Sequence, residues 1–98
     1  MIRFQRTMQV RRGRHAMRWA KELTDYVNTA FRRPMLALFR SRFGNLSVVW
    51  WFGDFEDLDA FEAWQRKVGA DRGYRELVKK SFDFVIDGSV VDTILEAV

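Results

Sequence analysis

The alternation of hydrophobic and polar positions changes its period along the chain, and each change marks a new element. Residues 2–10 alternate between apolar and polar side chains, interrupted only by Arg6, which indicates a half-buried β-strand. From residue 14 to Phe31 apolar side chains recur at intervals of three and four, which predicts an amphipathic helix of about five turns. Pro34 prevents this helix from continuing.

A β-hairpin is predicted after the proline. Residues 35–43 alternate again, and Gly44 and Asn45 form a tight-turn dipeptide before the next strand. That strand is apolar on both sides and is expected to end at Gly53. Its side chains divide into two sets, with Leu46, Val48, Trp50 and Phe52 on one face and Val49 and Trp51 on the other.

The helical period then returns. Asp54 or Asp57 can cap this helix at its acidic start, and its apolar stripe is Leu58, Phe61, Trp64 and Val68. Gly69 and Gly73 interrupt the pattern, which continues from Tyr74 through Val85 toward a stop near Asp87 and Gly88. Residues 90–98 are rich in β-branched side chains and predict a last strand.

The order of elements is therefore βαββαβ in one domain, residues 1–98. This is the pattern of an α+β, ferredoxin-like antiparallel sheet with its helices on one face. The other face would expose Trp or Val side chains of the third strand together with Leu36 and Leu38. Because so large an apolar area is rarely left in water, we expect a second copy to cover it, giving a homodimer with the sheets face to face.

Composition narrows the class of protein. The chain has no Cys, which excludes disulfides and thiolate metal sites. No segment resembles a signal peptide or a membrane span, so a cytoplasmic location is expected. Residues 1–44 hold eleven Lys and Arg against two acids, a net charge of +9, whereas residues 45–98 hold six against eleven, a net charge of −5. The basic half could attract nucleic acid, but its arginines are scattered without a recognition motif, and the oppositely charged halves could instead pair with each other.

One long segment carries a family resemblance. The sequence GNLSVVWWFGDFEDLDAFEAWQRKVGADRGYREL, residues 44–77, is similar to the NIPSNAP-like and antibiotic-biosynthesis-monooxygenase-like branches of the dimeric α+β barrel superfamily. The resemblance implies a dimer with a cavity between sheet and helices. It implies no single chemistry, because such families include cofactor-free monooxygenases, haem-degrading enzymes, polyketide cyclases and proteins with no assigned activity.

Some functional residues of these families have counterparts here. Trp64 matches the Trp of the haem-degrading members, Gln5 lies near the position of their Asn, and Tyr74 stands where their haem-ligating His would be. Tyr is the less common haem ligand in such folds, so no cofactor is expected. The cyclases resemble the chain in fold alone, because their acid/base pair needs a His on a late element and this chain has none.

His15 is the only histidine, so any His-based catalysis depends on it alone. It could act as a general base at the mouth of the sheet, or be an ordinary surface or capping residue. A metal site is not expected, since the acidic cluster Asp54, Glu56, Asp57 and Asp59 is explained by a helix N-terminus.

Polar groups on the second face of the sheet suggest a ligand site. If Ile2, Phe4 and Met8 face the helices, then Arg3, Gln5, Thr7 and Gln9 face away, joined by Arg40 and Arg42 if Phe39 and Phe43 share the helix side. Such groups on an apolar wall would suit an aromatic or acidic small molecule, or could pair with Asp92 or Glu96 across the dimer. The candidate ligand-binding residues are Gln5, Thr7, Arg40, Trp51, Trp64 and Tyr74.

Three functions remain open at this point. The first is binding of a small molecule, with or without turnover by a cofactor-independent, monooxygenase-like reaction, and with hydrogen bonds from Gln5, Tyr74 or an Arg. His15 is the remaining catalytic candidate. The second is a structural or interaction module whose role is dimerisation, and the third is nucleic-acid binding.

Overall fold

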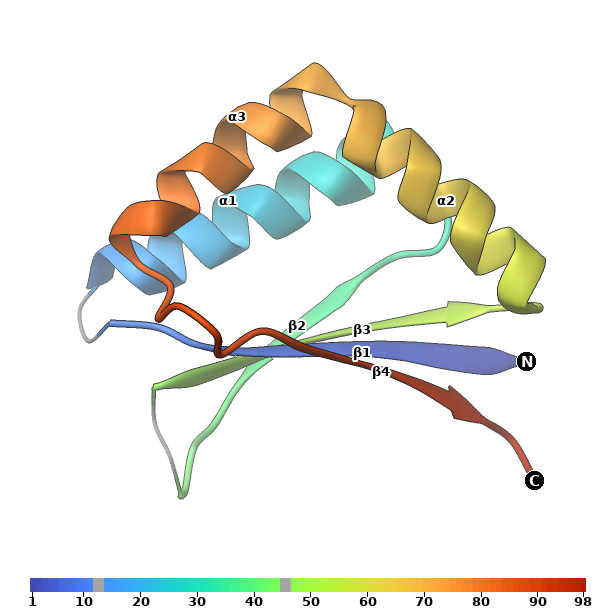
Figure 1. Ribbon diagram of the computed structural model, residues 1–98, viewed down its shortest axis with the longest axis horizontal. Helices are drawn as coiled ribbons and strands as arrows, with labels where there is room; N and C mark the ends of the chain where they lie inside the picture. Colours follow the sequence, from blue (N-terminus) through green and yellow to red (C-terminus); the bar gives the residue numbers. More distant parts are fainter. Residues whose placement is uncertain (12–13, 45–46) are drawn as a thin grey trace.

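The chain folds into one antiparallel sheet with helices packed on one side. A computed structural model describes residues 1–11, 14–44 and 47–98. The elements are β1 (Ile2–Gln9), α1 (Arg14–Ala30), β2 (Ala37–Arg40), β3 (Val48–Phe55), α2 (Leu58–Ala70), α3 (Arg72–Lys80), a 3₁₀ turn η1 (Ser81–Asp83) and β4 (Val91–Glu96). The strand order is β2-β3-β1-β4, and all three helices lie on the same side (Figure 1). The predicted α+β, ferredoxin-like fold is confirmed.

The register of the two central strands decides which side chains meet the helices. Phe4 lies opposite Gly53, Arg6 opposite Trp51, and Met8 opposite Val49. Paired residues share a face of the sheet, so the even-numbered residues of β1 and the odd-numbered residues of β3 point toward the helices. The predicted alternation, with Trp51 on the other side from Trp50, is confirmed.

Helix α1 supplies the centre of the core. Its buried stripe keeps the predicted helical spacing and consists of Ala16, Trp19, Ala20, Leu23 and Val27. The Trp19 indole N–H donates to the Leu77 carbonyl oxygen at 2.8 Å, and the Trp19 ring packs edge-on to Trp51 with centroids 6.2 Å apart. One side chain therefore joins α1 to both α3 and the sheet.

Two aspartates define the starts of the later helices. Asp57 caps α2 by accepting from the Ala60 backbone N–H at 2.8 Å. Asp71 separates α2 from α3 and caps α3 by accepting from the Tyr74 N–H at 2.9 Å. Of the two predicted caps, Asp57 has this role.

Two predicted boundaries are wrong. Gly53 does not end its strand, because β3 continues to Phe55. A Cβ on Gly53 would approach a Leu36 methyl carbon to 2.8 Å, so this glycine permits close packing within the strand. The last helix ends at Lys80, since Val85 forms a β-bridge with Val10 and cannot remain helical.

The hairpin strand β2 faces the opposite way from the prediction. Leu38 pairs with Trp51 and Leu36 packs on the core, so both leucines lie on the helix side. Arg40 pairs with Val49 on that same side, and the prediction that places it beside Gln5 is wrong. Arg42 and Phe43 lie beyond β2 and are exposed. The predicted turn residue Asn45 and the predicted strand residue Leu46 lie outside the described residues.

The face of the sheet away from the helices is uncovered in the single chain. We call it the open face, and its aromatic residues are Phe39, Trp50 and Phe52. The Phe52 ring lies 5.6 Å from that of Phe39 and 6.4 Å from that of Trp50, measured between centroids. Phe39 is 56% exposed. No helix in the described part of the chain is long and apolar enough to cross a membrane.

Candidate functional site

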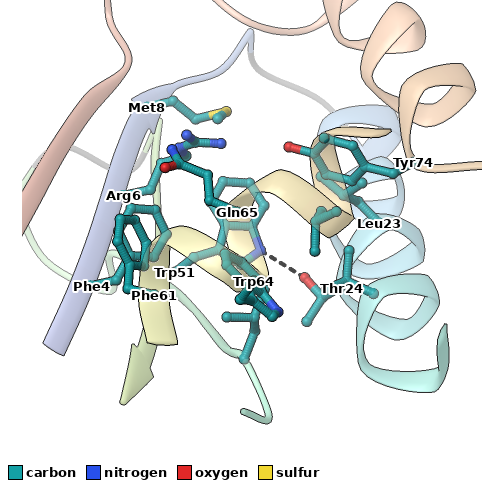
Figure 2. A pocket seen from close by; sticks show the side chains of 14 residues that line it. Phe4, Arg6, Met8, Leu23, Thr24, Trp51, Phe61, Trp64, Gln65 and Tyr74 are labelled. Atoms are coloured by element: carbon teal, nitrogen blue, oxygen red, sulfur yellow. Dashed lines mark hydrogen bonds between the residues drawn. The ribbon is translucent and has the colours of Figure 1, made fainter. Parts of the chain in front are cut away.

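A cavity of about 250 Å³ lies between the helix side of the sheet and the helices (Figure 2). Its wall is mostly aromatic and aliphatic. Side chains from β1, β3 and all three helices contribute to it, together with one from the segment before β2. The lining residues are Phe4, Arg6, Met8, Leu23, Thr24, Val27, Leu36, Trp51, Phe61, Trp64, Gln65, Val68, Gly69 and Tyr74.

Simple periodicities bring these residues together. The two-residue repeat of β1 places Phe4, Arg6 and Met8 on the helix side. The three-to-four-residue repeat of α2 does the same for its residues, which are Phe61, Trp64, Gln65 and Val68. The cavity is therefore built on regular elements and not on loops, which favours a well-defined shape.

Two consecutive hydrogen bonds fix one wall of the cavity. The Trp51 indole N–H donates to the Thr24 hydroxyl at 2.7 Å, as Figure 2 shows. The Thr24 hydroxyl in turn donates to the Ala20 carbonyl oxygen at 2.8 Å. Thr24 is the one buried polar residue of the described core, and both its hydroxyl proton and the Trp51 N–H have partners.

The indole N–H of Trp64 differs from that of Trp51. Its indole nitrogen is buried and has no hydrogen-bond partner among the described residues. Rings surround the indole, with the Phe55 centroid at 5.3 Å and the Phe4 and Phe61 centroids at 6.3 Å. A buried donor without a partner costs about 1–3 kcal/mol, and native proteins retain few of them. Trp64 also lines the cavity, so an unsatisfied donor belongs to a residue of its wall.

Arg6 brings a positive charge to the same wall. Its Nε and Nη2 donate to the two carboxylate oxygens of Asp92, on β4, at 2.7 and 2.8 Å. The hydrogen bond to Asp92 raises the pKa of the Arg6 guanidinium, burial opposes this, and the Tyr74 phenol adds a smaller favourable interaction. The guanidinium carbon lies 5.5 Å from the centre of the Phe4 ring, within cation–π range.

The predicted site residues are divided between different parts of the molecule. Trp51, Trp64 and Tyr74 come together around the cavity. Gln5 and Thr7 lie on the open face, opposite Phe52 and Trp50 respectively. Arg40 and His15 are exposed and do not line the cavity.

Three polar residues of the cavity wall were missed by sequence reasoning, namely Arg6, Thr24 and Gln65. A signal existed for the first two. Arg6 is the one polar residue that interrupts the apolar side of β1, and Thr24 stands between Leu23 and Val27 in the apolar stripe of α1. A polar residue in an otherwise apolar stripe is an indicator of a cavity or a buried hydrogen bond. Gln65 gives no such signal.

The charges of the two halves of the sequence meet within the fold. Besides Arg6 and Asp92, Arg3 pairs with Asp54 at 2.7 Å on the open face, and Lys80 lies 3.7 Å from Glu22. In each pair one partner comes from the basic half and one from the acidic half. Across residues 1–11, 14–44 and 47–98, no group of three or more His, Cys, Asp or Glu side chains is placed to hold a metal ion.

Comparison with known proteins gives matches at the level of structure. No protein-family model matches the sequence, and no curated protein matches it. A NIPSNAP family protein from Agrobacterium tumefaciens superposes with a TM-score of 0.82 and 17% identity, over 99% of this chain and 85% of its own. The fold is that of the NIPSNAP-like proteins. An uncharacterised NIPSNAP-like domain protein from Burkholderia xenovorans gives a TM-score of 0.76 and 20% identity, over 99% and 84% of the two chains.

A structure described as an antibiotic biosynthesis monooxygenase is also similar. Its TM-score is 0.73 at 13% identity, over 100% of this chain and 99% of that one. The resemblance inferred from residues 44–77 is thus confirmed, since the structural neighbours come from both of the branches that it named. At these identities the likeness to NIPSNAP-like proteins establishes the fold and assigns no reaction.

Proposed function

We propose that this protein binds a small aromatic molecule in the cavity between its sheet and its helices. The observation that carries the proposal is the composition of the cavity wall. Aromatic and aliphatic side chains form most of it, and they include Trp64, whose indole N–H has no hydrogen-bond partner among the described residues. Binding sites for small molecules combine an apolar lining with a few polar groups that orient the ligand.

The size of the cavity limits the ligand. Its volume of about 250 Å³ lies just below the ~300–1,000 Å³ of sites for drug-sized ligands. A planar molecule of one to three fused rings suits this space. Such a molecule could stack on the indoles of Trp51 and Trp64, because both rings line the cavity.

Turnover of the ligand by oxygen is the catalytic form of this proposal. The specific observation in its favour is the structural similarity to a protein described as an antibiotic biosynthesis monooxygenase. An electron-rich substrate with a methylene group between aromatic rings could react with O₂ without a cofactor, giving a ketone and water. The protein would orient the substrate and exclude water. Arg6 and Tyr74, which both line the cavity, would stabilise the negative charge that develops on the substrate oxygen.

A fluorescence titration tests the binding proposal. Polycyclic phenols that enter the cavity are expected to quench Trp51 and Trp64. The Trp50→Phe variant provides the control, because Trp50 lies on the open face. Quenching that persists in this variant supports the cavity, and quenching lost with Trp50 or absent across a broad panel overturns it. Oxygen uptake with the same compounds separates turnover from binding.

The open face supports a second proposal, that two copies associate through it. The apolar area formed by Phe39, Trp50 and Phe52 is of the kind that monomeric proteins rarely expose. A protein whose only role is dimerisation would share this face and would bind no ligand. Sedimentation equilibrium is expected to give twice the chain mass of 11.7 kDa, and a stable species of single-chain mass contradicts the association.

A further inference from the structure

Arg6 is the one charged side chain among the described residues that line the cavity. Asp92 accepts from Nε and Nη2 of the guanidinium, and the Tyr74 phenol interacts with it more weakly. Figure 2 shows the Arg6 side chain among the residues that line the cavity. The side chain is held in this position because its ion pair is bidentate and its guanidinium lies over the Phe4 ring.

The charges around the cavity favour an anion. No Asp or Glu side chain is among the described residues that line it, and Asp92 pairs with Arg6 without lining the cavity. Two groups on the wall can only donate, namely the Arg6 guanidinium and the Trp64 N–H, and the latter has no partner among the described residues. The Thr24 hydroxyl already donates to Ala20 and accepts from Trp51, and Gln65 can donate or accept. A ligand rich in acceptor oxygens, one of them ionised, complements this wall.

We propose that Arg6 makes the cavity selective for an acidic aromatic molecule, whose carboxylate or phenolate oxygen binds the guanidinium while a second acceptor receives the Trp64 N–H. The inference rests on the proposed function and adds the chemical class of the ligand and the residue that selects it. Asp92 positions the guanidinium and moderates its charge. It is therefore expected to limit the preference for anions to a moderate value.

A pair of probes with one ring system tests this selectivity. 2-Naphthoate and 2-naphthamide are nearly equal in size and both carry an acceptor oxygen, but only the first is charged. Titration calorimetry at neutral pH is expected to show about tenfold tighter binding of 2-naphthoate to the unmodified protein, because hydrogen bonds between charged groups are roughly twice as strong as neutral ones.

Two variants identify the source of the preference. In the double variant Arg6→Gln/Asp92→Asn, which removes both charges together, the two probes are expected to bind within about twofold of each other. In Asp92→Asn alone, the guanidinium keeps its charge and loses its partner. The affinity of this variant for 2-naphthoate is therefore expected to rise roughly threefold or more, and its affinity for 2-naphthamide should change little.

The open face offers a matched control. Arg3 and Asp54 form the same bidentate pair there, with Nε and Nη2 at 2.7 and 3.0 Å from the two carboxylate oxygens. The double variant Arg3→Gln/Asp54→Asn makes the same chemical change away from the cavity and is expected to keep the preference.

The outcomes separate this inference from the proposed function. Binding of neither probe overturns both. Binding of the two probes with equal affinity by the unmodified protein overturns the inference and leaves the cavity as a site for neutral aromatics. A preference that survives in Arg6→Gln/Asp92→Asn, or that disappears in Arg3→Gln/Asp54→Asn, shows that another group selects the anion and also overturns the inference.

Discussion

The two faces of the sheet carry similar residues in different surroundings. Each face has a tryptophan from β3, Trp51 under the helices and Trp50 on the open face. Each also has an Arg from β1 in a bidentate pair with Asp, and the Arg6 side chain is 29% exposed where that of Arg3 is 50% exposed. The same residue types therefore form a cavity wall on one face and an uncovered apolar surface on the other. The two faces differ in whether helices cover them. Alternation in the sequence alone does not specify which face the helices cover.

The largest expected effect comes from placing a charge on the open face. Phe52→Glu would bury a carboxylate in the proposed interface, and we expect it to cost about 2–4 kcal/mol of association free energy, which weakens the dimer by ~30–1,000-fold. Sedimentation equilibrium measures this change. Lys79→Glu, on the exposed helix surface, is the control and should leave the dimer intact. A dimer unaffected by Phe52→Glu would show that the copies meet elsewhere.

Replacing the Arg of each ion pair compares the contribution of the two pairs to stability on the two faces. Arg6→Met removes a bidentate ion pair and a cation–π contact from a guanidinium whose side chain is only 29% exposed, and we expect a loss of about 1–3 kcal/mol in the free energy of unfolding. Arg3→Met removes a pair whose Arg side chain is 50% exposed and should have a smaller effect. Urea unfolding of both variants tests this order. Equal losses would mean that the cavity face is as solvated as the open face.

The two tryptophans of the cavity should respond differently to the loss of their N–H groups. Trp51→Phe breaks the hydrogen bond to the Thr24 hydroxyl, at an expected cost of about 1–2 kcal/mol in addition to lost packing. Trp64→Phe removes a donor that has no partner among the described residues, so its cost in the free protein should be smaller by about 1 kcal/mol. Thermal unfolding measures both. A larger loss for Trp64→Phe would imply that its N–H is already satisfied.

The smallest expected effect is a change in the pKa of Asp54, on the open face. The hydrogen bond from Arg3 lowers the pKa of Asp54 below its ordinary 3.8. The contribution of Asp54 to stability is therefore present above the unfolded pKa and is lost as pH falls through the lower folded pKa. Arg3→Met should return the Asp54 pKa toward 3.8 and remove this dependence. Carboxyl carbon NMR follows the titration, and an unchanged Asp54 pKa would rule out Arg3 as the cause.

The fold was predictable because it depends on periodicity. The alternation in residues 2–10 and the helical stripe from Ala16 to Val27 each specify an element and its buried face. The ends of helices and strands were harder to predict where tertiary contacts determine them. Gly53 stays within β3 because the strand continues to pair with β1 there, opposite Phe4, and the absence of a side chain leaves room for Leu36.

The candidate site was predictable in part. Trp51, Trp64 and Tyr74 were identified from apolar faces and from family resemblance, and they do meet around one cavity. Gln5 and Thr7 were placed correctly on the face away from the helices, but the cavity lies on the other face. The role of Arg6 could not be derived from alternation alone, because its position requires a partner on β4, which is 86 residues away along the chain.

The indole N–H resonances of the four tryptophans provide the most direct test of the central claim. Trp19, Trp50 and Trp51 donate to the Leu77 carbonyl, the Ser41 hydroxyl and the Thr24 hydroxyl, whereas Trp64 has no such partner among the described residues. On addition of 2-naphthoate to ¹⁵N-labelled protein, the Trp64 indole proton should move downfield the most and that of Trp50 should not move. A Trp64 resonance that stays in place at saturation, or a shift confined to Trp50, would contradict ligand binding in the cavity.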